Sequence, residues 1–406
     1  MADTTQKILF ANSTFEFSSF ACDCEVDLIH PSKGVTRHTY RLYPKEDALY
    51  YAYKPGQGLV SKKRNGANEG IPLLPELLAI KDDDSKAVKT FIERHGFLLP
   101  LDANENNSVE SDTLFRFINR LKATVSLMSA LGESKTNYEK ITALTLYLLL
   151  TPQCSIKLSD GYQKVTTCPH NIEQVWNNTY RSDGLGQKTN VERLYNDMGC
   201  HVNDSIRPPK TWLDMNKYLY AVDYFLQHPS SVIAKSTCLF MDATTVDSNC
   251  RLAIDFLYHF CQEVGDIQAW NHKGELSFTE NSPSANIRFK KGFDENMQKG
   301  LIKLAKNTIK TEIEYNLHGI NPSYDTDSMA PSWYVNCLLA GIYFSLFYMR
   351  PEIELYRACA NPNCGFSFLV KSTSSKQKYC SSTCGNAMAQ RNHRRRKNEQ
   401  QIINNQ

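Results

Sequence analysis

The stretch CANPNCGFSFLVKSTSSKQKYCSSTCGNAMAQRNHRRRK, residues 359–397, combines four cysteines with a run of arginines. Four residues separate Cys359 from Cys364, three separate Cys380 from Cys384, and fifteen lie between the two pairs. Two closely spaced cysteine pairs separated by a loop of this size are typical of a tetrahedral four-thiolate zinc site. Because four thiolates leave no open position for water, we expect one structural zinc ion and no catalytic metal here.

The segment between the two pairs predicts a small module built around the metal. Two strand-like pieces, FSFLV (366–370) and KQKY (376–379), suggest a hairpin, and Gly365 suits a tight turn after a ligand. About 40 residues with so little apolar material cannot build an adequate core. We therefore expect the module to fold only when it binds the metal.

A basic tail follows the second cysteine pair. Residues 356–397 contain nine Lys and Arg residues and no Asp or Glu, whereas the whole chain has a net charge of only +3. The sequence after Cys384 is rich in helix formers, and Arg391, Arg394 and Arg395 would share a helix face. Arginine suits phosphate contact and bidentate recognition of guanine, so the tail suggests nucleic-acid binding. The expected contact residues are Arg391, His393, Arg394, Arg395, Arg396, Lys397, Lys376 and Lys378.

These residues resemble the CGNR zinc finger family of bacterial proteins. Gly385 and Asn386 match its Cys-Gly-Asn-Arg signature after the fourth cysteine, and the Arg- and His-rich helix follows; Ala387 stands where the family has arginine. The resemblance covers about 40 residues and implies that the four cysteines are zinc ligands. In many members the finger follows a helical, ligand-sensing domain, often called ABATE, which the rest of this chain resembles only in order and class.

Length and composition describe the rest of the chain. With 406 residues, 41% of them hydrophobic and 22% charged, it has the composition of a soluble globular protein of two or three domains. Nine of its 13 cysteines are scattered, and no export signal precedes them, so we expect a cytoplasmic protein with reduced cysteines. The most apolar run, Trp333 to Met349, is shorter than the roughly 20 residues of a bilayer span, so we expect a buried core helix there and no membrane segment.

Residue patterns predict a change from strand to helix along the chain. Residues 7–20 and 38–53 are rich in β-branched and aromatic residues, and ELSFTE at 275–280 suggests a further strand. Apolar residues recur at helical spacing after residue 87, with Gly96 and Gly132 as stop signals. The expected helices lie within 87–101, 111–131, 136–152, 210–229, 249–264, 292–317 and 333–349.

No standard catalytic motif identifies the chain as an enzyme. It contains no phosphate-binding loop, dinucleotide fingerprint, HExxH or GxSxG sequence. Helical bacterial RNases often carry an Arg and a His about one turn apart, but Arg251 and His259 are eight residues apart, about 80° out of line on a helix. The sequence favours a protein without catalytic activity and leaves the enzyme question open.

We therefore expect a mostly α-helical fold in three parts. Residues 1–60 form a β-leaning segment, 87–350 a helical body with a ligand-sensing role, and 356–397 a treble-clef or ribbon-like four-cysteine finger with a basic helix. The favoured function is a zinc-dependent nucleic-acid-binding protein of bacteria, a transcription regulator that binds DNA in preference to RNA. Its helical body would take a small molecule or a protein partner, and a homodimer would extend the contact.

Two alternatives remain open. The chain could be a stress or phage-defence effector whose helical body cleaves nucleic acid after the finger docks. Alternatively, the finger could serve only structural or protein-interaction roles, by capping the last core helix. Zinc without affinity for nucleic acid would indicate the latter.

Overall fold

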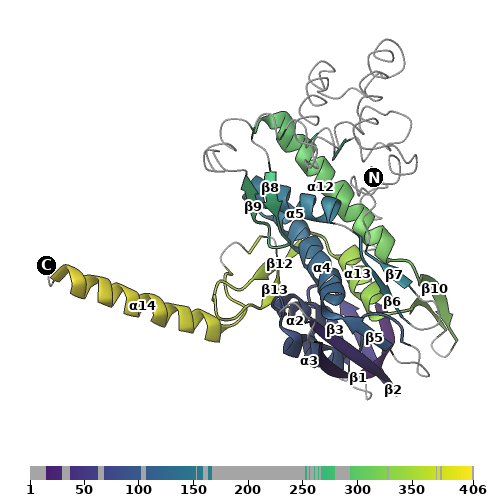
Figure 1. Ribbon diagram of the computed structural model, residues 1–406. Helices are drawn as coiled ribbons and strands as arrows, with labels where there is room; N and C mark the ends of the chain where they lie inside the picture. The colour runs from purple at the N-terminus through teal and green to yellow at the C-terminus, as the bar shows by residue number, and fades with distance from the viewer. Residues whose placement is uncertain are drawn as a thin grey trace, which may run out of the picture. The chain divides into compact units, whose positions relative to one another are not determined.

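The computed structural model describes most of the chain outside residues 167–266 (Figure 1). The described segments are 15–29, 37–62, 68–101, 107–151, 153–158, 163–166, 267–278, 293–326, 329–371, 373–374 and 377–404, with isolated positions in 252–264. Two compact units emerge. Unit 1 comprises Met1–Thr136, Cys154–Thr166 and Ile313–Gln406, and unit 2 comprises Asn137–Gln153 and Thr167–Glu312.

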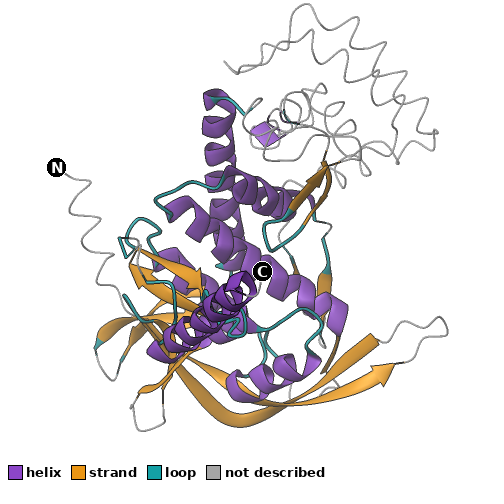
Figure 2. Ribbon diagram, turned by 90° about the vertical axis from the view of Figure 1, so that its left-hand side faces the viewer, coloured by secondary structure: helices purple, strands orange, loops and turns teal. Residues whose placement is uncertain are grey.

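A five-stranded antiparallel sheet forms the N-terminal part of unit 1. Its strands run in the order β1 (Phe15–Ile29), β2 (Arg37–Lys54), β3 (Gly58–Lys62) and β4 (Asn68–Pro72), and β5 (Asn107–Glu110) also pairs with β2. The long β1–β2 hairpin is conspicuous in Figure 2. Phe15 and Phe17 alternate with exposed residues along β1, so one face of the hairpin enters the core.

Four helices of unit 1 pack with this sheet. They are α2 (Leu73–Ala79), α3 (Ser85–His95), α4 (Ser111–Gly132) and α13 (Leu338–Tyr348). The Asp84 side chain caps α3 by accepting a hydrogen bond from the Ala87 amide, and Gly96 ends this helix with a φ of 76°. Between β1 and α13, the ring centroids of Phe15 and Phe344 lie 4.4 Å apart.

The apolar run 333–349 is not a single helix. It begins as the end of β11 (Ala330–Val335), which pairs with β10 (Ile320–Asp325), and becomes helical only at Leu338. The expectation of one continuous helix is wrong here because Trp333, Tyr334 and Val335 all favour a strand. The Cys337 sulfur then caps α13 by accepting from the Ala340 amide.

Unit 2 contains α5 (Tyr138–Leu150), the hairpin of β8 (Ile267–Trp270) and β9 (Leu276–Phe278), and most of α12 (Glu295–Asn316). The buried side of α12 includes Met297, Leu301 and Leu304. A short hairpin of β6 (Ser155–Lys157) and β7 (Gln163–Val165) belongs to unit 1. Within the described segments, no helix is both long enough and apolar enough to cross a bilayer.

The secondary structure is more mixed than the sequence patterns predicted. Helices account for 45% and strands for 30% of the confidently placed residues, so a mostly α-helical fold is not confirmed. The expected N-terminal strands, the strand within 275–280 and the helices at 87–101, 111–131, 136–152 and 292–317 are present with adjusted ends. The helix expected at 210–229 lies outside the described residues, and 249–264 is described at only a few positions.

Candidate metal centre and basic helix

A two-stranded hairpin supports the cysteines. It consists of β12 (Glu354–Ala358) and β13 (Ser367–Lys371), which pair antiparallel with Leu355 opposite Val370. The predicted hairpin between FSFLV and KQKY is therefore wrong in its second strand. The strand partner precedes the first cysteine, and the described part of KQKY runs as a loop.

The first cysteine pair lies in a tight turn between the two strands. The Cys359 amide donates to the Phe366 carbonyl at 2.8 Å, and the Cys364 amide donates to the Asn361 carbonyl at 2.9 Å. Gly365 follows with a φ of 66°, as a turn after the second ligand requires. These bonds curl the backbone so that both sulfur atoms face the same point.

The second pair lies where α14 (Ser382–Asn404) begins. Cys380 precedes the helix and Cys384 lies in its first turn. The Ser381 hydroxyl oxygen accepts from the Cys384 amide at 3.3 Å, and the Ser381 carbonyl accepts from the Gly385 amide at 3.1 Å. The start of α14 is thus fixed to the cysteine cluster by its own first turn.

The four sulfur atoms gather at one point. All lie within 4.8 Å of one another, and the Cys364–Cys380 and Cys380–Cys384 sulfur pairs are each 3.6 Å apart. Zinc–sulfur bonds of about 2.3 Å in a tetrahedron place the sulfur atoms about 3.8 Å apart, so the cluster has the size that zinc requires. The four cysteines can hold one zinc ion in a closed, structural site.

The thiols of the second pair differ in acidity. A hydrogen bond with Asn361, together with bonds from Cys364 and Cys380, lowers the pKa of Cys384 to about 7. Desolvation, reinforced by the neighbouring thiols, raises the pKa of Cys380 to about 12. Zinc binds thiolates, so the thiol protons must leave when the metal enters.

The finger has a small core of its own and also contacts the sheet of unit 1. Leu355, Phe368 and Val370 are buried, and the four cysteines pack around them with Phe366 and Tyr379. On the sheet side, the Gly56 amide donates to a Glu354 carboxylate oxygen at 3.0 Å. Tyr356 lies so close to Gly58 that a β-carbon on Gly58 would be 2.7 Å from its hydroxyl oxygen. The hairpin is therefore attached to the turn between β2 and β3.

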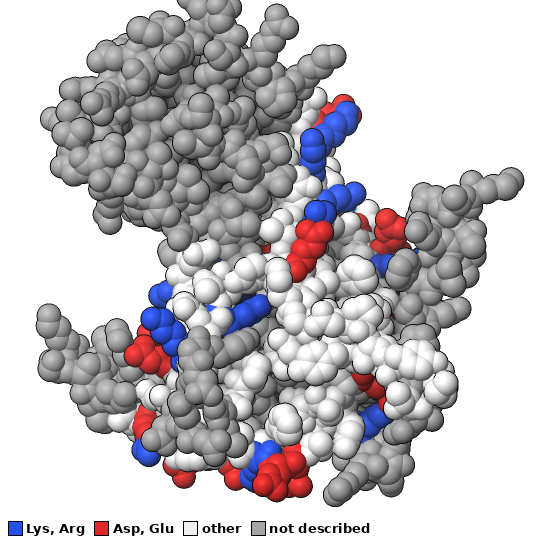
Figure 3. All heavy atoms as spheres, turned by 90° about the vertical axis from the view of Figure 1, so that its right-hand side faces the viewer, with Lys and Arg blue, Asp and Glu red and all other residues white. Residues whose placement is uncertain are grey.

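The basic residues of α14 lie on the surface. Every residue from Arg391 to Lys397 is exposed, and α14 leaves the finger as one continuous helix (Figure 1). At about 100° per residue, Arg391, Arg394 and Arg395 fall on one side of the helix. The opposite side carries Arg396 and Lys397 together with His393. By contrast, Figure 3 shows a face of the molecule on which acidic and basic side chains are interspersed.

The loop between β13 and the second cysteine pair holds the other predicted contacts. Lys378 is exposed there, whereas Lys376 lies outside the described residues. The Arg357 guanidinium donates to the carbonyls of Ser374 and Gln377 at 2.8 and 2.7 Å. The sequence carries no local signal for this role of Arg357, because no pattern marks the strand β12 on which it lies.

The residues that motivated a nuclease alternative, Arg251 and His259, lie outside the described residues. Among the described residues, the only group of three or more His, Cys, Asp or Glu side chains with metal-binding geometry is the cysteine cluster.

Comparison with known proteins agrees with this geometry. Residues 356–397 match the family model described as "CGNR zinc finger", which covers most of the hairpin, the four cysteines and the basic part of α14. No curated protein and no solved structure matches the chain significantly. Because the matched segment also brings its four thiols together, residues 356–397 of this chain are a CGNR zinc finger.

Proposed function

We propose that the chain is a zinc-dependent nucleic-acid-binding protein that regulates transcription. The observation that carries this proposal is α14, an exposed basic helix whose first turn contains a zinc ligand. Binding the metal fixes Cys384 and therefore the start of the helix relative to the hairpin. Zinc thus controls the surface that meets the phosphates.

Duplex DNA is the favoured partner because cations surround α14. A helix in the major groove of B-DNA has a phosphate backbone on each side, which suits a helix with cations on opposite sides. The major groove of A-form RNA is too narrow and deep for side chains to read. One finger seldom supplies full specificity, so a homodimer, or a second contact regulated by a ligand or protein partner, would complete the site.

A titration tests the proposal. Purified protein of known metal content is titrated against labelled duplex DNA and structured RNA at two salt concentrations. We expect salt-sensitive binding to DNA that is lost when zinc is chelated, and Cys380→Ser should lose zinc and binding together. Preference for RNA would overturn the groove argument while leaving the zinc-dependent surface intact.

A charge variant tests α14 itself. Replacing Arg394 and Arg395 by alanine should preserve zinc content, weaken binding to all sequences and reduce the salt slope by about 2, roughly 0.9 for each lost phosphate contact. The control replaces the exposed Lys303 and Lys306 of α12 by alanine, which changes the net charge equally. If both variants bind DNA equally well, α14 is not the contact surface.

A structural role is the second candidate, and the packing of Tyr356 against Gly58 favours it. In this case the zinc finger stabilises unit 1 and contacts no nucleic acid. One bound zinc per chain without affinity for either polymer would select this candidate.

A further inference from the structure

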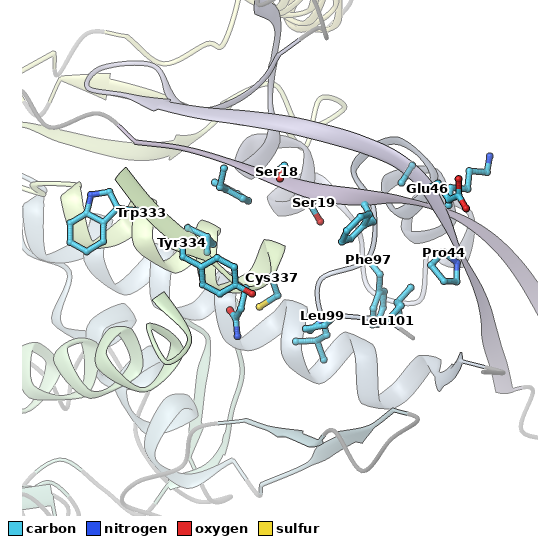
Figure 4. A pocket seen from close by; sticks show the side chains of 17 residues that line it. Ser18, Ser19, Pro44, Glu46, Phe97, Leu99, Leu101, Trp333, Tyr334 and Cys337 are labelled. Carbon is cyan, nitrogen blue, oxygen red and sulfur yellow. The ribbon is translucent and has the colours of Figure 1, made fainter. Parts of the chain in front are cut away.

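A cavity of about 600 Å³ lies in unit 1, away from the zinc finger (Figure 4). Its walls come from β1, from the bulged part of β2, from the segment after α3 and from β11. In Figure 4, Ser18 and Ser19 lie on one side of the open space, Phe97, Leu99 and Leu101 on another, and Tyr334 opposite Phe97. Small-molecule sites typically enclose about 300–1,000 Å³, so the volume suits a ligand of modest size.

An irregularity in the long hairpin shapes this cavity. Phe20 pairs with Ala48 and Cys22 with Pro44, so a single residue of β1 faces three residues of β2. The extra residues bulge away from the ladder and place Lys45 and Glu46 at the rim. Gly96 supports the bend, because a β-carbon there would lie 2.3 Å from the Phe20 carbonyl oxygen.

Exposed aromatic rings surround the hollow. Phe20 is 67% exposed, Tyr334 59% and Trp333 37%, although all three line the same cavity. Isolated exposed apolar residues are ordinary, but several large rings around one cavity indicate a binding site. The inner walls of Phe17, Phe97 and Leu99 are buried core residues, which makes this surface largely preformed.

The charges of the lining indicate the kind of ligand. Lys45 already forms an ion pair with Asp23 at 2.6 Å. Glu46 lies at the rim, and the other lining side chains are uncharged. Such a cavity offers neither a cluster of cations for a phosphate nor a set of carboxylates for a metal. It favours a neutral ligand with flat apolar rings that can stack on the aromatic walls.

We propose that this cavity, between the β1–β2 bulge and β11, binds a neutral aromatic small molecule. The aromatic walls supply most of the contact, and Ser19, which lies on the same face of β1 as Phe17, can offer its hydroxyl to a polar edge of the ligand. The wall that carries Trp333 and Tyr334 continues through Cys337 into α13, after which the chain enters the finger at β12. Trp333 also packs edge-on against Phe344 of α13, with ring centroids 5.1 Å apart.

The test uses N-phenyl-1-naphthylamine, a neutral aromatic probe that brightens in apolar surroundings. The full-length, zinc-loaded protein should bind it saturably with one site per chain. Replacing both Phe20 and Tyr334 by alanine should weaken binding by about tenfold or more, because it removes two contacting rings. The control variant replaces Phe347 and Tyr324 by alanine; these residues are 50% and 55% exposed but do not line the cavity. This variant should bind the probe as tightly as the wild type does.

A second variant keeps the aromatic residues and fills the cavity. Ser19→Trp places a large side chain at the cavity wall and should abolish saturable binding while the circular dichroism spectrum stays that of the wild type. A probe fluorescence that does not saturate in the wild type would overturn the proposal. An equal loss of probe affinity in the cavity double variant and the control double variant would also overturn it. So would unchanged probe affinity in a folded Ser19→Trp variant.

Discussion

Replacing Leu355 by alanine should strongly destabilise the zinc finger. Leu355 is fully buried in β12 and packs with Phe368, Val370 and the cysteines. The change removes three carbon atoms, which at about 0.8 kcal/mol each gives a transfer loss of about 2.4 kcal/mol. The cavity left behind adds to this loss, so we expect a total of about 2–5 kcal/mol.

Equilibrium urea unfolding measures this loss of stability. Zinc release to a coloured chelator reports the unfolding of the finger itself. The variant should release zinc at lower urea concentration, and the zinc-loaded wild type should retain the metal longest. Because zinc binds only the folded finger, excess zinc should move both proteins to higher midpoints and preserve the order between them.

Ile353→Ala is the matched control, since it removes the same number of carbon atoms two residues earlier. Ile353 is 51% exposed, so Ile353→Ala should lower the free energy of unfolding by less than half as much as Leu355→Ala. Equal midpoints for the two variants would refute the shared core between the hairpin and the cysteine cluster.

Three further predictions concern the attachment and shape of the finger. Gly58→Ala should destabilise unit 1 more than Gly56→Ala, because both glycines have positive φ but only Gly58 lies against Tyr356; adding Tyr356→Phe should restore part of the difference in unfolding midpoint. Burial raises the pKa of Glu354, so its contribution to folding is most favourable below the unfolded pKa and declines as pH rises through the folded pKa. Glu354→Gln keeps an acceptor for Gly56 and should gain stability over the wild type from about pH 4 upward. A difference in unfolding free energy between variant and wild type that does not change with pH would contradict this. Arg357→Lys should speed hydrogen exchange or proteolysis in residues 372–379 without loss of zinc, because both bonds come from the Arg357 Nη1 and the shorter lysine side chain does not reach the carbonyls of Ser374 and Gln377 in the same way.

Local spacing explains which features could be predicted from the sequence. The cysteine cluster follows from two short spacings, and the helix ending at Gly96 follows from its periodicity and stop signal. The strand partner of β13 is ELYRA, residues 354–358, which precedes the first cysteine, whereas the strand-like pattern predicts a hairpin between the two cysteine pairs. No local signal marks a strand that closes a hairpin around a metal turn.

Long-range contacts explain most of what could not be predicted. The hydrogen bond from Gly56 to Glu354 joins residues 298 positions apart, and the local sequence around either residue does not predict the contact. The cavity likewise requires β1, the bulge of β2 and β11 to meet, although each looks like an ordinary strand. The apolar pattern of 333–349 predicts a helix, whereas Trp333 and Tyr334 lie in β11 at the cavity wall.

The attachment of the hairpin and the exposure of α14 together explain why zinc matters to this chain. The hairpin is held by the sheet through Glu354 and Tyr356, independently of the metal. The described part of α14 is mostly exposed, including every residue from Arg391 to Lys397, and Cys384 in its first turn packs with the cysteine cluster. An isolated polar helix is only marginally stable in water. Removing zinc should therefore leave β12 in place and release α14, so hydrogen exchange after chelation should rise far more in 385–397 than in 354–358. Equal protection of both segments would show that the metal does not position the basic helix.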